Sequence, residues 1–286
     1  MKDEKKLENW YFERTARNHF WVGGKEGQKK ISELKIAVAG LGGMGAHIAE
    51  LLVRAGVRHI RISDPDTVDI SNINRQVIAN SLTVGMTKRE AVRQELLKIA
   101  PETEVICYPG VNADNVEEFV DGVDAVVDEI DVFPLDRHVM LHKAARQKKL
   151  ALYSAYIVGL GTHFYKFEGE DFTFEDFLGI RNEKELKAPT ADFLLAKFGH
   201  PLPAYLQDEN EKKFKDAIAT GSIPIFGPAT LLGQSLVVTR LLMDVMGEKN
   251  MPWGGATPVM PNFLVLDPAE INFKVVDFTA QNKKVA

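Results

Sequence analysis

A glycine-rich segment, Gly40-Leu-Gly-Gly-Met-Gly45, directly follows a short apolar run at residues 35–39. Glycine lets the backbone turn tightly and approach a phosphate, and the N-terminus of a following helix adds amide donors. Asp64 ends the next alternating segment, where a carboxylate can accept hydrogen bonds from ribose hydroxyls. The pattern predicts a nucleotide site rather than a bare turn, without distinguishing NAD from ATP, and its loop glycines are Gly40, Gly42, Gly43 and Gly45.

A cluster of charged and amide side chains follows Asp64, in the segments DPDTVDISNINRQ and VGMTK. Arginine offers a planar fork to phosphate oxygens, lysine a mobile point charge, and asparagine and glutamine neutral donors. A triphosphate site needs such a cluster and a dinucleotide domain does not, so the set favours ATP over NAD. A solvated polar loop is the simpler interpretation of Arg75 or Lys88 taken alone. The members are Asp66, Asn72, Arg75, Gln76 and Lys88.

Strand and helix patterns alternate along the first half of the chain, and these elements must position the candidate residues. A strand, a glycine turn, a helix and a second strand form a βαβ unit, whose crossover helix forces parallel pairing. The sequence therefore predicts an α/β, Rossmann-like fold with a mostly parallel central sheet flanked by helices. Expected strands cover residues 35–39, 58–63, 104–108, 125–128 and 151–154, and expected helices cover residues 42–55, 87–99, 115–120 and 135–148.

Residues 168–222 differ in character, because they are rich in charged and aromatic side chains and contain three prolines. We interpret this segment as an inserted loop-and-helix region that forms a lid or a substrate surface. We expect Phe172, Phe174 and Phe177 to pack rather than to contact substrate. The insert is preceded by a β-rich stretch at 159–167. It is followed by a helix at 229–246, which we place in the core or at a dimer interface, and by strands at 263–266 and 271–276. Residues 1–286 are then one domain, divided into an N-terminal helical segment (1–33), a nucleotide-binding core (34–167), the insert (168–222) and a C-terminal helix with strands (223–286).

Composition narrows the class of protein further. The net charge of −5 over 286 residues makes nucleic acid a less attractive partner, although a local basic surface remains possible. No apolar run approaches the ~18 residues that span a bilayer, and the charged N-terminus lacks a signal core, so we expect a cytoplasmic protein without a membrane partner. The single cysteine, Cys107, excludes an intramolecular disulfide and a four-thiolate zinc site, and we expect it to be a core thiol of the third strand.

Taken in order, GLGGMG, DPDTVDISNINRQ, VGMTK and the strand end VVDEID resemble the ThiF/MoeB/HesA adenylyltransferases, relatives of the ubiquitin-activating enzymes. The resemblance covers residues 14–165 well and 223–278 more loosely. It implies an ATP- and Mg²⁺-dependent enzyme that adenylates a carboxylate, at the C-terminus of a ubiquitin-like protein or a peptide, and releases pyrophosphate. It also implies a homodimer.

The resemblance further assigns roles to individual residues. Asp64 is the ribose ligand and Asp66 the second acid of its pair, while Gln76 joins the nucleotide set. Asn72, Arg75 and Lys88 bind the polyphosphate, and Asp131, at the end of the fourth strand, serves Mg²⁺ and ATP. Arg17 occupies the position of an arginine that enters the partner's site. Arg75, Lys88 and the metal would stabilise charge on the departing phosphates, so no covalent protein nucleophile is required. We expect only modest burial of Arg75, Lys88 and Asp131, because they lie at strand ends and in loops.

The chain also departs from the family pattern. No cysteine follows Cys107, which makes thioester transfer doubtful, and the zinc-binding cysteines of many relatives are absent, so no zinc is expected. Val132 replaces the usual asparagine after Asp131. His138 and His142 are spaced like metal ligands on a helix, but without an evident third ligand we assign them to an ordinary helix face. The alternatives are an adenylating dehydratase acting on a modified tRNA base, a non-catalytic nucleotide-binding partner subunit and, least supported, an NAD-dependent oxidoreductase.

Overall fold

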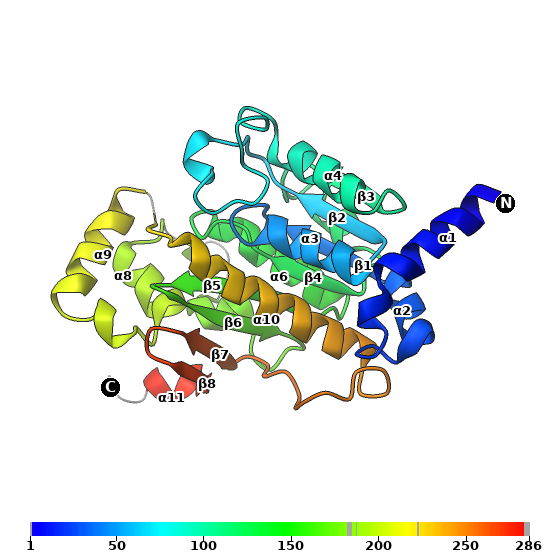
Figure 1. Ribbon diagram of the computed structural model, residues 1–286. Coiled ribbons are helices and arrows are strands. Elements are labelled where there is room, and N and C mark those ends of the chain that lie inside the picture. Colours follow the sequence, from blue (N-terminus) through cyan, green and yellow to red (C-terminus); the bar gives the residue numbers. More distant parts are fainter. Residues whose placement is uncertain (1, 182–184, 187, 222, 283–286) are drawn as a thin grey trace.

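An eight-stranded sheet runs through the computed structural model, which describes residues 2–181, 185–186, 188–221 and 223–282 (Figure 1). The strand order is β3-β2-β1-β4-β5-β6-β7-β8. The first five strands are parallel, and β6, β7 and β8 continue the sheet in antiparallel fashion. This arrangement confirms the predicted fold class. The strands are β1 (Lys35–Ala39), β2 (His59–Ser63), β3 (Glu104–Tyr108), β4 (Ala125–Asp128), β5 (Leu152–Val158), β6 (Gly161–Phe167), β7 (Asn262–Asp267) and β8 (Asn272–Asp277).

Helices cover both faces of the sheet. Side chains alternate along a strand, so Ile36 and Val38 of β1 face one apolar core while Ala37 and Ala39 face the other. The first core is closed by α2 (Gly24–Glu33), α3 (Gly45–Ala55), α4 (Lys88–Ile99) and α10 (Gly227–Met246). The second is closed by α5 (Val116–Val120), α6 (Leu135–Gln147) and the short helices of the insert. The central parallel strands β1 and β4 are mostly apolar because both of their faces are buried, whereas the outer strands β2 and β3 also carry polar and charged side chains.

The boundaries of two helices show how the sequence sets the loops around the nucleotide site. Helix α3 begins at Gly45 and not at residue 42, because the glycine segment before it forms a loop with Gly40 at φ +84°. Helix α4 begins at Lys88, and the Thr87 hydroxyl caps it by accepting a hydrogen bond from the Glu90 N–H. Both helices therefore present their N-termini at the same edge of the sheet. The N-terminal segment adds α1 (Lys2–Arg14) and a single turn at Ala16–Asn18.

Helix α10 is longer and more apolar than expected from the sequence, in which no apolar run comes close to the length of a membrane span. It has 20 residues with a mean hydropathy of 1.3, so its length and composition alone would allow it to cross a membrane. About half of it is buried, and Figure 1 shows it crossing the near face of the sheet, where it packs on β5, β6 and α3. Its buried side chains, among them Val237 and Leu241, belong to the first core. This is the packing of a core helix.

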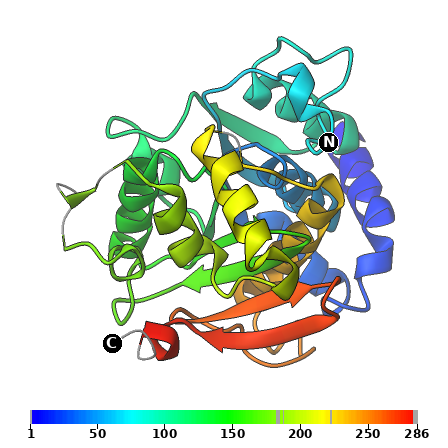
Figure 2. The ribbon, with the colours of Figure 1, turned by 90° about the vertical axis from the view of Figure 1, so that its left-hand side faces the viewer.

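The insert folds into short helices that pack on the sheet, as the sequence predicted. They are α7 (Phe174–Leu178), α8 (Ala191–Leu194), a turn at Leu195–Gly199, a turn at Ala204–Leu206 and α9 (Glu209–Ala219). Figure 2 shows the helices in yellow-green on the side of the molecule that faces the viewer. Phe174 and Phe177 are buried in the second core, which confirms that they pack. The terminal helix α11 (Phe278–Asn282) covers the same core through Phe278.

Cys107 lies in β3, as predicted, but it is not a fully buried core thiol. Strand β3 is an edge strand of the sheet, and the Cys107 side chain is half-buried beside α4. Partial burial raises the pKa of the thiol. A protonated thiol is a poor nucleophile, so nothing in this position favours a reactive cysteine.

Candidate nucleotide-binding site

A cavity of about 790 Å³ opens at the carboxyl ends of the parallel strands. Ligand sites of open α/β sheets form at this edge, where the strand order reverses direction. Here the reversal falls between β1 and β4. The cavity brings together nearly all of the residues singled out in the sequence: Gly40, Gly42, Gly43, Asp64, Asp66, Asn72, Arg75, Gln76, Lys88 and Asp131.

The four glycines of the loop have two different structural roles. A Cβ on Gly40 would lie 2.1 Å from the Glu129 carbonyl oxygen, and one on Gly45 would lie 1.8 Å from the Gly40 carbonyl oxygen. These two glycines permit the close approach of loop, helix and strand. A Cβ on Gly42 would meet only the Gln76 side-chain nitrogen, at 4.0 Å, so this glycine faces the cavity. Gly43 also faces the cavity, next to the Arg75 side chain.

Helix α10 holds the glycine loop in place. The Gln234 side-chain amide donates a 2.9 Å hydrogen bond to the Gly43 carbonyl and lies 3.1 Å from Nδ1 of His47. Gln234 is buried, and a buried amide left without partners would be costly. This contact could not be predicted from the sequence, because Gln234 is far from the loop along the chain and lies within an apolar helix.

Asp64 fixes the shape of the loop edge. Its Oδ2 accepts a 2.7 Å hydrogen bond from the Leu41 N–H, and its Oδ1 accepts a 2.8 Å hydrogen bond from the Asp66 N–H. Burial raises the pKa of the Asp64 carboxyl, while the nearby Lys88 ammonium, 3.9 Å away, opposes the shift. Asp64 thus lies at the end of β2, beside the glycine loop, where a ribose bound along the loop would meet it.

Lys88 is more buried than the sequence suggested. Only 8% of the residue is exposed, and its Nζ donates a 2.8 Å hydrogen bond to Oδ2 of Asp66. Asp64 is also buried, with 4% exposed, whereas the Asp66 side chain is 63% exposed. The expectation of modest burial was therefore wrong for Lys88, because the loop after β2 folds back over the first turn of α4.

Arg75 presents an uncompensated positive charge to the cavity. Its Nη1 donates to the Ser71 carbonyl at 3.2 Å and to Oδ1 of Asn74 at 2.9 Å. Among the residues that the structure describes, its guanidinium forms no ion pair with a carboxylate. Neutral oxygens orient the fork without neutralising it, so its charge stays available to a phosphate.

Two amides complete the polar part of the cavity. Oδ1 of Asn72 accepts a hydrogen bond from the Asp69 N–H in a capping box, which leaves the Asn72 amide nitrogen as the free end of that side chain. Gln76 is buried, and its Oε1 has no hydrogen-bond partner within the described parts of the chain. A buried acceptor without a partner is costly unless a ligand donates to it.

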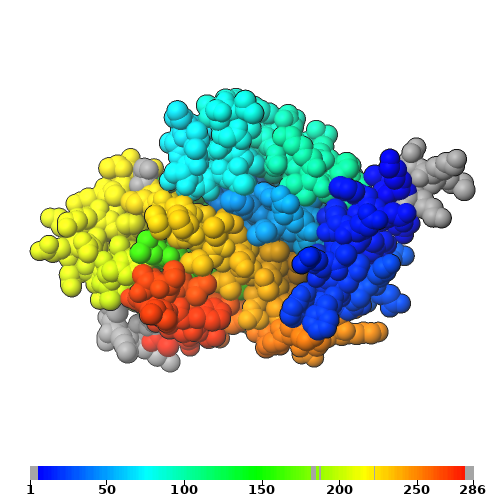
Figure 3. Space-filling view, viewed as in Figure 1, coloured from blue at the N-terminus to red at the C-terminus, as the bar shows by residue number. Residues whose placement is uncertain are grey.

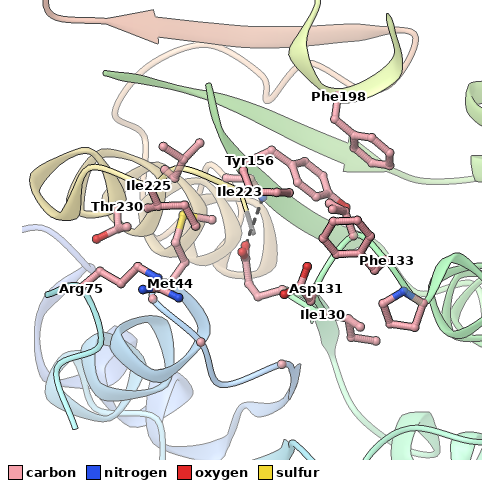
Figure 4. Close-up of a pocket in the computed structure, with 18 of the residues that line it drawn as sticks. Met44, Arg75, Ile130, Asp131, Phe133, Tyr156, Phe198, Ile223, Ile225 and Thr230 are labelled. Carbon is pink, nitrogen blue, oxygen red and sulfur yellow. Dashed lines mark hydrogen bonds between the residues drawn. The ribbon is translucent and has the colours of Figure 1, made fainter. Parts of the chain in front are cut away.

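Asp131 lies three residues beyond the end of β4 and not at the strand end itself. It is exposed to the cavity, and its carboxylate takes part in no hydrogen bond or ion pair in the described portion of the structure. Figure 4 shows it between Arg75 on one side and Phe133 on the other. A carboxylate in this setting is free to bind a cation that a polyphosphate brings with it.

The residue that ends β4 is Asp128, and it organises the two histidines of α6. His138 Nδ1 lies 2.6 Å from Oδ2 of Asp128, and His142 Nε2 lies 3.2 Å from the same oxygen. All three side chains are buried. The other ring nitrogen of His138 faces the Asp131 carbonyl at 3.1 Å. The histidines therefore form a buried polar cluster that holds the backbone of Asp131, which differs from the ordinary helix face expected from their spacing.

The pKa values in this cluster diverge. The two histidines hold the pKa of the Asp128 carboxyl below its usual range against the effect of burial. Burial opposes the charged form of His138, but the Asp128 carboxylate outweighs this effect and raises the pKa of His138. For His142, burial dominates and lowers the pKa. Both nitrogens of His138 face oxygen acceptors, so this ring is best satisfied as an imidazolium donating twice.

Glu129 is a cavity residue that the sequence reasoning missed. Its Oε1 accepts a 3.1 Å hydrogen bond from the Ala155 N–H. Burial, with a smaller effect of Asp128, raises the pKa of this carboxyl well above its usual value. The raised pKa means that the negative charge of Glu129 is disfavoured beside the phosphate loop. Thr230 of α10 and Arg137 of α6 also line the cavity and were not foreseen.

Arg17 and Gly45 are the predicted residues that the structure does not bring to the cavity. Gly45 lies behind the loop, in contact with Gly40. Arg17 is exposed in the turn Ala16–Asn18 and is absent from the cavity lining. Its predicted role concerns a partner subunit, and it remains a prediction. Among the described residues, no group of three histidine, cysteine, aspartate or glutamate side chains is arranged to hold a metal by itself.

Comparison with protein-family models matches residues 13–285 to the ThiF family. This chain belongs to the ThiF family. The match confirms the resemblance seen in the motifs, and it extends through the insert to the C-terminal strands. Among curated relatives of this ThiF protein, the adenylyltransferase and sulfurtransferase UBA4 of Saccharomyces cerevisiae is 37% identical over 142 residues, which is 49% of this chain and 31% of the relative.

A second relative of the ThiF protein is the tRNA threonylcarbamoyladenosine dehydratase of Bacillus subtilis, 39% identical over 127 residues, or 44% of this chain and 50% of the relative. The ThiF chain thus spans half or less of the length of these two relatives. Among solved structures, Escherichia coli MccB with ATP aligns with a TM-score of 0.64 at 18% identity, covering 88% of this chain and 65% of that one. PaaA aligns with a TM-score of 0.60 at 15% identity, covering 97% and 74%. These structural likenesses concern the fold.

Proposed function

We propose that this ThiF-family protein is an ATP-dependent adenylyltransferase that activates a carboxylate as an acyl-adenylate and releases pyrophosphate. The observation that carries the proposal is the gathering of Arg75, Lys88 and Asn72 opposite a glycine loop whose edge is fixed by Asp64. A dinucleotide site would not need the free charge of Arg75. The acceptor that we infer is the C-terminus of a ubiquitin-like protein or a peptide, or another carboxylate.

The residues of the chain have separate tasks in this reaction. The acceptor oxygen attacks the α-phosphorus of ATP, and the bond to the bridging oxygen of the β-phosphate breaks as pyrophosphate leaves. Arg75 and Lys88 stabilise the charge that builds on the departing phosphates, as fixed cations do in phosphoryl-transfer sites. Lys88 is held by Asp66 at 2.8 Å, so a bound phosphate shares this ammonium with an exposed carboxylate.

Asp131 fits the role of the Mg²⁺ ligand. Magnesium in nucleotide sites is commonly held by one or two carboxylates together with substrate phosphates and water. The free carboxylate of Asp131 lies in the cavity with no competing partner among the described residues. When bound, the metal would neutralise charge on the phosphates, and the contact between His138 and the Asp131 carbonyl would keep its ligand in place.

The proposal includes a homodimer. Large apolar side chains are exposed along the loop after β2 and at the start of α10. A Cβ on Gly227 would lie 2.3 Å from the Asn74 carbonyl oxygen, so the two segments touch. Figure 3 shows the loop, in cyan, directly above the golden N-terminal part of α10. An apolar patch of this kind favours association with a second copy, and its members are Ile70, Ile73, Val77, Leu82, Phe226 and Leu231.

Calorimetric titration with Mg·ATP and with NAD tests the nucleotide assignment. We expect Mg·ATP to bind more tightly, and Arg75→Ala to weaken that binding. Arg93→Ala is the matched control, because Arg93 is a half-exposed arginine of α4 that does not line the cavity. Tighter binding of NAD than of Mg·ATP would overturn the proposal.

Light scattering at micromolar concentration tests the proposed homodimer. A molar mass equal to that of a monomer would refute it.

A second candidate is an adenylating dehydratase acting on a modified tRNA base. The relative from Bacillus subtilis favours it, and activation of a carbonyl oxygen would use the same polyphosphate contacts. The net charge of −5 opposes it, since nucleic-acid binding depends on cationic contacts with phosphates. Stimulation of ATP cleavage by bulk tRNA, but by no peptide or small carboxylate, would favour the dehydratase over the first proposal.

A further inference from the structure

The cavity is larger than the polar site just described, and its second end is apolar. Strand β5 and the insert line this end with six side chains, Tyr156, Leu194, Leu195, Phe198, Phe214 and Ile218. Phe133, from the loop before α6, lies on the same side, as Figure 4 shows for Phe133, Tyr156 and Phe198. None of the lining residues from β5 or the insert carries a charge.

Tyr156 contributes its ring and not its hydroxyl to this end. The hydroxyl is buried and has no hydrogen-bond partner in the described regions of the chain, so it is not directed at the open cavity. The ring packs against Phe198 with 4.6 Å between centroids. Phe198 itself is 5% exposed and packs against Phe177 of α7. The aromatic surface is therefore fixed from behind by the second core.

The order of the strands places this apolar end away from the nucleoside. Asp64 follows β2, the glycine loop follows β1, and Asp131 follows β4, so the polar groups run along the sheet edge in that order. Pro65, Gly110 and Val111 line the cavity beyond Asp64, on the side of β3. A nucleotide with its ribose at Asp64 and its phosphates at the glycine loop therefore leaves the apolar end, beside β5, unfilled.

We propose that the acceptor is a carboxylate whose neighbouring group is apolar, a branched aliphatic or aromatic group that fills this end of the cavity. The inference rests on the proposed adenylation and deepens it. The side chains of β5 and the insert offer no charge to a polar or charged group, which would lose its hydration here, whereas an apolar group would be removed from water against fixed rings. Arg137 of α6 lines the same cavity, so an acidic probe is a required comparison. Such a group occurs in free hydrophobic acids and in peptides that end in a hydrophobic residue.

The geometry also accounts for the reacting oxygen. With its apolar group against Tyr156 and Phe198, an acceptor lies on the β5 side of Asp131 and points its carboxylate towards the glycine loop. One carboxylate oxygen then forms a bond to the α-phosphorus, and the electron pair of the breaking bond leaves with pyrophosphate. The Glu129 carboxyl lies between the glycine loop and β5, and its raised pKa disfavours the negative charge that would repel an incoming carboxylate.

Binding to the full-length protein, in the presence of Mg²⁺ and a non-hydrolysable ATP analogue, tests the inference. The probes are N-acetyl-phenylalanine, N-acetyl-leucine, N-acetyl-glycine and N-acetyl-aspartate, with octapeptides ending in Phe or in Gly-Gly as a second arm. We expect the apolar probes to bind roughly tenfold or more tightly than the glycine and aspartate probes. Preference for the small N-acetyl-phenylalanine over its peptide, or the reverse, identifies the source of the acceptor.

Phe214→Arg tests the surface itself. Phe214 is only partly buried, so an arginine can be accommodated, and its charge should reverse the preference towards N-acetyl-aspartate. Asp216→Arg places the same side chain on the same helix, at an exposed position outside the cavity lining, and should keep the apolar preference. Equal or tighter binding of N-acetyl-glycine or N-acetyl-aspartate by the unaltered protein would overturn the inference.

Pyrophosphate exchange into ATP with the same probes separates this inference from the proposed function. Apolar selectivity in binding without exchange by any probe would argue against adenylation and leave the apolar site supported. Exchange that is fastest with Gly-Gly peptides would support adenylation and overturn the apolar acceptor. Exchange that is fastest with the apolar probes, and is lost in Phe214→Arg, is the expected result.

Discussion

The two types of glycine in the loop lead to a direct test of the nucleotide site. Gly42 has room for a methyl group, since its nearest neighbour would be the Gln76 nitrogen at 4.0 Å, and its φ lies outside the left-handed region. Gly45 has none, because the new Cβ would lie 1.8 Å from the Gly40 carbonyl oxygen. Gly42→Ala should therefore preserve the fold, whereas Gly45→Ala should damage it.

The expected magnitudes differ in sign. Where the backbone is compatible, replacing glycine by alanine stabilises a protein by about 0.4–1 kcal/mol, because the unfolded chain loses conformational freedom. For a domain of this size, 1 kcal/mol corresponds to roughly 2–4 °C in Tm, so Gly42→Ala should raise Tm slightly. Overpacking costs typically about 1–3 kcal/mol and sometimes more. The new Cβ at Gly45 would overlap a backbone carbonyl oxygen, which cannot move aside as a side chain can. We therefore expect the Tm of Gly45→Ala to fall by several degrees.

Gly42→Ala should weaken the binding of nucleotide although it does not destabilise the fold. The methyl group of Gly42→Ala points into the cavity where a phosphate must approach the backbone, and we expect the Kd for Mg·ATP to rise about tenfold or more, which is ~1.4 kcal/mol or more. Thermal unfolding without ligand and calorimetric titration measure the two effects separately. Gly255→Ala, at another open glycine outside the cavity, is the control. A well-folded Gly42→Ala protein with unchanged affinity would refute the assignment of this loop to phosphate binding.

Four other substitutions test the remaining parts of the structure. Arg75→Ala and Asp131→Ala should each slow pyrophosphate exchange about a hundredfold or more. In the double variant the two losses should not add, because both groups act on one polyphosphate. Full activity in Asp131→Ala would place the site elsewhere. Cys107→Ser should keep its exchange rate, and loss of activity in a folded protein would revive a thioester step. Burial lowers the pKa of His163 from 6.5 to about 3, so between these values the unfolded chain binds a proton that the folded chain does not. The free energy of unfolding should therefore fall by about 1.4 kcal/mol per pH unit on acidification in this range. Urea unfolding at pH 5 and pH 7 should show a smaller loss of stability in His163→Phe than in the unaltered protein. An equal loss in the two proteins would contradict this prediction.

The nucleotide half of the molecule could be predicted from the sequence because its signals are local. The apolar run before Gly40 and the acid that ends β2 are each recognisable within a few residues, and the βαβ rule places them at one edge. The fold class and the family followed from the same patterns. Burial was harder to predict, since Lys88 is covered by a loop that closes on it only in the folded chain.

The acceptor half could be predicted only as an inserted segment that forms a lid or a substrate surface, because the signals of its individual residues are distant and chemically plain. Tyr156, Phe198 and Phe214 are ordinary apolar residues in the sequence, and only the packing of the insert on β5 brings them to one cavity. The same holds for the contact between Gln234 and Gly43. His138 and His142 gave a spacing signal, but their partner, Asp128, had no feature that distinguished it from the other acids near the end of β4.

The two ends of the cavity are encoded in different stretches of the chain. The glycine loop, Asp64, Arg75, Lys88 and Asp131 all precede α6, whereas most of the apolar end comes from β5 and the insert. An insertion, a deletion or a few substitutions in residues 168–222 could therefore remodel the acceptor surface while the inherited phosphate contacts stay as they are. In evolution, and equally in protein engineering, this division allows one nucleotide chemistry to be offered to new substrates by exchanging a single surface segment.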